Sequence, residues 1–104
     1  MAKAAERGSV DWVVEKAAGF LGVKSAHIKT ASFRVKHREQ WQVVAYAAWV
    51  VSERNAVEIG RSLGGVDHAL ILIAREAVRA RIEKDQEFND MVTKLLEDLR
   101  IALF

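Results

Sequence analysis

The most informative stretch of the chain is Glu58-Ile59-Gly60-Arg61-Ser62-Leu63-Gly64-Gly65-Val66-Asp67-His68. It predicts a helix, a turn built on glycines and a second helix that Asp67 opens, because aspartate is a favoured N-cap and glycine tolerates left-handed backbone. Asn55 is a good N-cap for the first of these helices, which we expect over residues 56–63. This order is typical of a helix-turn-helix, a motif whose second helix lies in the major groove of DNA.

The rest of the chain is also patterned as helix, because proline is absent and apolar residues recur at helical spacing between a few glycines. We expect helices from Ser9 to Gly22, from about Arg38 to Ser52, from Asp67 to about Ile82 and from Asp85 onward, with Ser25 capping a short helix that ends near Lys29. Residues 30–37 are polar and basic, and we expect a loop there. The sequence therefore predicts an all-α bundle of about five to six helices. We expect a single domain over residues 9–101, with residues 1–8 flexible.

Charge is unevenly distributed along the chain, although the net charge is only +2. Residues 17–38 hold five lysines or arginines, two histidines and no acid, whereas residues 83–98 hold six acids and two lysines. A basic part and an acidic part suit a protein that meets a polyanion with one face, but the same clustering also arises on an ordinary solvated surface.

The motif at residues 58–68 resembles one family, the C-terminal DNA-binding domain of the bacterial replication initiator DnaA. That family carries Phe-Gly-Gly-Arg-Asp-His-Thr-Thr-Val where this chain has Leu63-Gly64-Gly65-Val66-Asp67-His68-Ala69-Leu70-Ile71. The similarity extends over about Val10 to Leu99 and includes the opening helix, the basic segment and the final acidic and apolar helix. It implies a Trp-repressor-like helix-turn-helix bundle that binds duplex DNA with a sequence preference.

The resemblance also implies which residues would meet DNA. In the family, the second helix of the motif reads bases in the major groove, and a basic loop sends an arginine into the minor groove. That arginine falls on Phe33 when the sequences are aligned without gaps, and on Arg34 after a slip of one residue. The residues expected at DNA are Arg34, Lys36, Arg38, Gln42, Arg61, Asp67, His68 and Ala69, with Arg75 flanking the backbone.

Two of these residues carry a specific chemical expectation. Asp67 would accept a hydrogen bond from a cytosine amine, and His68 would contact a base or a phosphate. Ala69 could touch the methyl group of a thymine. For Asp67, a role confined to capping its own helix stays open, since an N-cap carboxylate bonds backbone N–H groups whether or not DNA is present.

Departures from the family keep a second interpretation open. Arginines and a lysine of the family are replaced here by Val66, Trp41 and Trp49, and residues 69–73 form an apolar opening that one helix face cannot bury completely. An exposed apolar patch usually marks a partner surface. On this alternative, the chain is a protein-interaction or dimerisation module with degenerate DNA reading, and its interface would contain Trp41, Trp49, Val66, Leu70 and Ile73.

Other function classes fit poorly. The Gly-x-x-x-x-Gly-Lys-[Ser/Thr] pattern that would mark an ATPase module is missing, and the three histidines lie far apart with no cysteine to complete a metal site. We therefore expect no catalysis, no metal and no cofactor. The longest apolar run, residues 43–51, is too short to span a bilayer. We expect duplex DNA as the partner, a homodimer or protein partner as the alternative, and a cytoplasmic, nucleoid-associated protein that regulates replication or transcription.

Overall fold

The computed structural model describes residues 5–103, and over that range the chain forms seven α-helices and no strand. They are α1 (Val10–Leu21), α2 (Ser25–Ile28), α3 (Ala31–Lys36), α4 (Arg38–Ser52), α5 (Ala56–Ser62), α6 (His68–Lys84) and α7 (Gln86–Leu103). The all-α prediction is confirmed. The number of helices exceeds the predicted five to six, because a segment expected to be a loop is helical.

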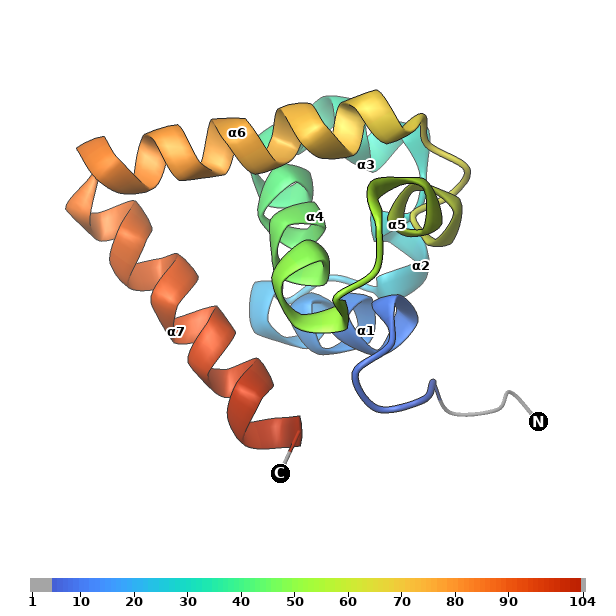
Figure 1. Cartoon of the computed structure of the whole chain (residues 1–104), viewed down its shortest axis with the longest axis horizontal. Helices are drawn as coiled ribbons and strands as arrows, with labels where there is room; N and C mark the ends of the chain where they lie inside the picture. The colour runs from blue at the N-terminus through green and yellow to red at the C-terminus, as the bar shows by residue number, and fades with distance from the viewer. Residues whose placement is uncertain (1–4, 104) are drawn as a thin grey trace.

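Helix α4 occupies the centre of the bundle (Figure 1). It packs against α1, α6 and α7. A helix surrounded in this way must be apolar on most of its surface, and α4 buries residues on several sides. Those residues are Trp41, Val43, Val44, Ala45, Ala47 and Ala48.

Side-chain caps define where several helices begin. The Ser9 hydroxyl accepts a hydrogen bond from the backbone N–H of Trp12 at 3.1 Å, as predicted. Gly22 ends α1 with φ at 74°, a left-handed conformation that costs glycine little. The prediction for α2 was wrong by one residue, because Lys24 is its N-cap and Ser25 is already helical.

The segment that was predicted as a loop, residues 30–37, contains α3 instead. The hydroxyl of Thr30 caps this helix by accepting from the N–H of Phe33 at 3.1 Å. Phe33 is buried, and its ring lies between those of His27 and His37, at centroid distances of 5.4 and 5.1 Å. A six-residue helix with a single buried side chain has no apolar period to detect, so tertiary packing rather than local pattern forms it.

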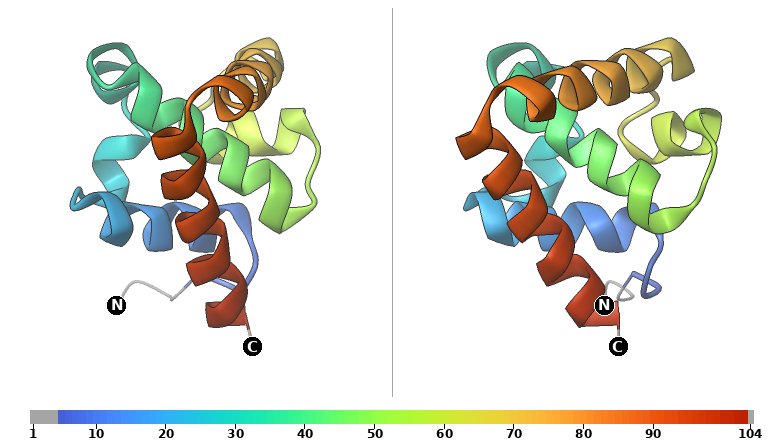
Figure 2. Two further views of the ribbon diagram at one scale, coloured as in Figure 1. Left: turned by 90° about the vertical axis from the view of Figure 1, so that its left-hand side faces the viewer. Right: turned by 60° about the vertical axis from the view of Figure 1, so that its left-hand side comes forward.

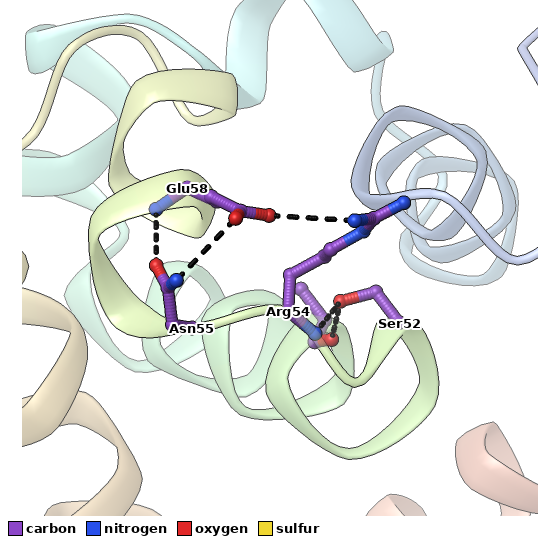
Figure 3. A network of polar contacts seen from close by, with 5 residues as sticks. Ser52, Arg54, Asn55 and Glu58 are labelled. Carbon is purple, nitrogen blue, oxygen red and sulfur yellow. Dashed lines mark hydrogen bonds and ion pairs between the residues drawn. The ribbon is translucent and has the colours of Figure 1, made fainter.

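The connection from α4 to α5 is fixed by a small polar network (Figure 3). The Asn55 side chain accepts from the backbone N–H of Glu58 at 2.9 Å and donates to the Glu58 carboxylate at 3.3 Å. Arg54 pairs with the same carboxylate at 3.7 Å. Asn55 is therefore the N-cap that the sequence predicted, and it sets the first residue of α5.

The stretch predicted to be flexible, residues 1–8, is only partly covered, since residues 1–4 lie outside the described residues. Ala5 packs against the core, and the Glu6 carbonyl accepts from the N–H of Ser9 at 3.0 Å. Within residues 5–103, no helix combines the length and the apolar character that crossing a membrane requires.

Candidate nucleic-acid interface

The turn between α5 and α6 needs glycine at two positions where the backbone comes close to the carbonyl oxygen of another residue. The Gly60 carbonyl accepts hydrogen bonds from the N–H groups of Gly65 and Val66, at 3.1 and 2.8 Å, and a Cβ on Gly60 would overlap the Val66 carbonyl oxygen. Gly64 has φ at 95°, and a Cβ there would overlap the carbonyl oxygen of Lys29. The turn is therefore seated tightly against α5 and against the end of α2, which fixes the direction in which α6 leaves it.

Val66 lies in this turn and is only 8% exposed. Its side chain belongs to the core, so the prediction that it contributes to a partner interface was wrong. The apolar residue fills space beneath the turn and offers little surface to a partner.

The start of α6 is exposed and carries the predicted reading residues. The Asp67 carboxylate accepts from the N–H of Ala69 at 2.8 Å, which makes Asp67 the N-cap that the sequence predicted. The same carboxylate lies 3.4 Å from Nδ1 of His68. The side chains of Asp67, His68 and Ala69 all face solvent. Capping accounts for one carboxylate oxygen and leaves the other available.

The next residues of α6 divide between core and solvent. Ile71, Ala74 and Val78 are buried, whereas Leu70, Leu72 and Ile73 are 38%, 37% and 52% exposed. The expectation that the apolar run 69–73 cannot be buried by one helix face is confirmed. The first two turns of α6 therefore present an apolar surface to solvent.

Helix α3 and the start of α4 bring the predicted cations next to this surface. Both α3 and α6 lie at the end of the molecule opposite to α1 (Figure 2). Between them is a hollow of about 320 Å³ with no acidic residue in its lining. The lining residues are Arg34, Val35, Arg38, Trp41, Gln42, Leu70 and Ile73. Three predicted DNA contacts and three predicted partner contacts thus share one hollow. Val35, 74% exposed, was missed because nothing in the polar segment around it signalled a role.

Trp41 belongs to the core, since it is only 3% exposed, and the prediction that it forms a partner surface was wrong. Its buried Nε1–H finds no hydrogen-bond acceptor within residues 5–103. A buried N–H without an acceptor is costly, and Trp41 lines the hollow between α3 and α6.

Trp49 is half-buried beneath two arginines. The guanidinium carbons of Arg75 and Arg79 lie 5.0 and 4.9 Å from the centre of its ring. Glu76 pairs with both arginines, at 3.0 and 3.5 Å. Trp49 is therefore largely covered as a partner contact, and Arg75 is held by its neighbours rather than free to reach a phosphate.

Some cations of the described chain form ion pairs with carboxylates, and others do not. Lys29 pairs with Asp11 at 2.7 Å, and Arg81 pairs with Glu39 at 3.1 Å and with Asp85 at 3.4 Å. By contrast, no ion pair within residues 5–103 involves the remaining predicted cations. Those cations are Arg34, Lys36, Arg38 and Arg61. Unpaired cations that share one end of a molecule favour contact with a polyanion.

The part of the chain that the structure describes contains no cluster of three His, Asp or Glu side chains able to hold a metal ion. What the geometry offers is a binding surface: an apolar helix start, a hollow and unpaired cations.

Comparisons with known proteins identify relatives of one kind. The chain is 28% identical over 92 residues to the chromosomal replication initiator protein DnaA of Anaplasma marginale, which covers 88% of this chain and 20% of that protein. It is 26% identical over 87 residues to the DnaA of Wolbachia pipientis, covering 84% of this chain and 19% of that protein. It is 39% identical over 59 residues to the DnaA of a Bradyrhizobium species, covering 57% of this chain and 12% of that protein.

The chain thus spans a fifth or less of the length of these initiators. No family profile matches it, and no solved structure matches it. The similarity is to one part of a replication initiator.

Proposed function

We propose that the chain is a duplex DNA-binding protein of the DnaA C-terminal domain type, with a single helix-turn-helix domain over residues 9–101. The proposal rests on the unpaired cations that flank the exposed start of α6. It is supported by the similarity to proteins that are named chromosomal replication initiators. The protein acts by binding rather than by catalysis.

In this proposal, the start of α6 enters the major groove, with Asp67, His68 and Ala69 facing bases. Arg34 reaches the adjacent minor groove from α3, and Lys36, Arg38 and Arg61 contact phosphates. The DNA backbone then crosses the hollow between α3 and α6. A phosphate oxygen there would accept from the side-chain amide of Gln42.

The proposed biological role draws on the similarity to replication initiators. A binding domain of this type acts in the bacterial cytoplasm, at the nucleoid, and regulates replication initiation by competing for initiator sites or regulates transcription. Departures such as Ala69 and Leu70, where the family has threonines, change the reading surface, so we expect a recognised sequence different from that of the initiators.

The test is binding of the purified protein to random-sequence duplex DNA over a salt series, followed by sequencing of the bound pool. We expect affinity to fall steeply as salt rises, together with an enriched motif. Arg38→Ala should weaken binding, because Arg38 is exposed and unpaired beside the hollow. Absence of salt-dependent binding to any duplex would overturn the proposal.

A second candidate function is protein interaction through the same end of the molecule. The observation in its favour is the exposure of Leu70, Ile73 and Val35 around the hollow. Sedimentation equilibrium of the wild type and of Leu70→Glu tests it. A self-associating wild type that becomes monomeric in the variant would support a dimerisation module, and a monomeric wild type would count against one.

A further inference from the structure

We propose that α6 recognises DNA chiefly through the methyl groups of thymine, so that the preferred site is defined by A·T pairs at the positions that α6 covers. This inference rests on the proposed DNA binding and specifies what the reading helix detects. It arises from residues in which this chain departs from the initiator sequences.

The first argument is the surface that α6 presents. With 3.6 residues per turn, the face opposite the buried Ile71, Ala74 and Val78 begins with Ala69, Leu72 and Ile73. Leu70 lies at the edge of this face, beside the hollow. Ala69, Leu70, Leu72 and Ile73 are all exposed. We call these four residues the apolar reading face.

The second argument is the scarcity of hydrogen-bonding side chains. Bidentate reading of bases needs arginine, lysine, asparagine or glutamine at the helix start. After His68, the first side chain of α6 able to hydrogen-bond is Arg75, and it is engaged by Glu76 and by the Trp49 ring. Asp67 already uses one carboxylate oxygen to cap the helix. Only Asp67 and His68 therefore remain for polar reading.

The third argument is chemical complementarity. The C5-methyl of thymine is the apolar feature of the major-groove edge in unmodified DNA, and alanine or larger apolar side chains contact it. Each methyl group removed from water against the apolar reading face would raise affinity roughly fourfold. Pairs that contain cytosine or guanine offer no methyl and leave the same side chains facing polar base edges.

The charges around the apolar reading face select DNA as its occupant. Arg34 and Arg38 line the hollow beside it, with no acid in the lining. A second copy of the chain that packed this face against itself would bring these cations together, which is unfavourable. A duplex instead supplies phosphates to the cations and methyl groups to the apolar side chains.

The experiment replaces thymine by deoxyuridine, which lacks the C5-methyl and keeps the base pair. The random-sequence pool is synthesised with either thymidine or deoxyuridine, and both pools are titrated with the full chain at one salt concentration. Thymines of the selected motif are then replaced one at a time. We expect the deoxyuridine pool to bind more weakly, and each contacted position to cost roughly fourfold in affinity.

Protein variants separate methyl contact from a change in DNA shape. Leu72→Ala and Ile73→Ala should reduce the ratio between thymidine and deoxyuridine affinities, because they remove the atoms that the methyl groups touch. Arg38→Ala should weaken binding to both DNAs and leave that ratio unchanged. Ile101→Ala, at a residue 74% exposed on α7, is the matched apolar control and should alter neither. Thermal unfolding verifies that every variant is folded.

Two different failures are distinguishable. Equal, salt-dependent binding to both pools would overturn the methyl inference and leave the proposed DNA binding intact. A ratio that persists in both Leu72→Ala and Ile73→Ala would also overturn it, because the preference would then come from DNA shape or from other residues. No binding to either pool would overturn the proposed function itself.

Discussion

Gly60 is the glycine at which the surrounding backbone leaves least room for a side chain. Its hydrogen atom points at the Val66 carbonyl oxygen, with which a Cβ would overlap. Gly60→Ala must push the turn away from α5, and we expect it to lower the free energy of unfolding by about 2–3 kcal/mol. Chemical denaturation of both proteins measures the difference.

Gly19 provides the matched control for this prediction. It lies in α1, and a Cβ there meets no atom within 4 Å. Gly19→Ala should therefore raise the free energy of unfolding by about 0.5–1 kcal/mol, because alanine favours helix. Similar destabilisation by both substitutions would show that the close approach of the turn to Gly60 does not govern stability.

Asp85 makes the stability of the fold depend on pH. The backbone N–H of Phe88 donates to its carboxylate at 3.0 Å, which lowers the pKa of that carboxyl from its ordinary value of 3.8, and Arg81 lowers this pKa further. Because the folded pKa is depressed, the charged carboxylate stabilises the fold above pH 3.8, and this stabilisation is lost as the pH falls towards the folded pKa.

Asp85→Asn removes the charge and keeps a side chain that caps helices well. We expect the wild type to melt at a higher temperature than this variant at neutral pH, with a difference that shrinks as the pH falls below 3.8. Melting curves recorded at several pH values measure the difference. A difference that stays constant through this range would contradict a depressed pKa at Asp85.

At the scale of elements, the sequence predicts the helices whose ends are chemically marked. Asn55 and Asp67 cap α5 and α6 as expected, because their side chains bond backbone N–H groups within the first turn. The bounds of α4 also agree with the prediction. Which side of α4 faces the core could not be read, since the helix is apolar all round, and for this reason Trp41 was assigned to a surface although it is buried.

Helix α3 is an element that the local sequence pattern does not predict. Its cations were identified from the sequence, but their placement on a helix depends on Phe33, which is buried and packs against the rings of His27 and His37. A single buried side chain leaves no apolar period in the sequence. The hollow between α3 and α6 was likewise unpredictable, because it forms only when three helices meet.

Thr30 tests whether α3 positions its cations. The hydroxyl accepts from the N–H of Phe33 and donates to the His27 carbonyl at 2.7 Å, so it ties α3 to the segment before it. We expect Thr30→Ala to cost about 1 kcal/mol of stability. Under the proposed function, it should also weaken DNA binding, because Arg34 and Lys36 lose their fixed direction.

Thr30→Ser keeps the hydroxyl and should retain most of both properties. Thermal unfolding and a DNA titration of the two variants measure them. DNA binding that survives in Thr30→Ala with wild-type affinity would show that α3 need not be ordered for its cations to act.

At the scale of the whole molecule, the position of the cations matters more for DNA binding than the net charge does. The net charge is only +2, and an excess this small attracts DNA weakly by itself. The unpaired cations of α3 and of the start of α4 lie with the start of α6, at the end of the molecule away from the C-terminal part of α7 (Figure 2). Elsewhere in residues 5–103, some lysines and arginines have a carboxylate partner, as Lys94 has Asp98 at 3.5 Å, whereas others, such as Lys16 and Lys24, have none.

This arrangement predicts that only some cations contribute to the salt dependence of DNA binding. Arg38→Ala should reduce the slope of log affinity against log salt by about one, because one phosphate contact is lost. Lys94→Ala, which changes the net charge by the same amount on α7, should leave the slope unchanged. Titrations at several salt concentrations measure both slopes. If Lys94→Ala lowered the slope as much as Arg38→Ala, net charge rather than one oriented face would drive binding, and the placement of DNA across α3 and α6 would be wrong.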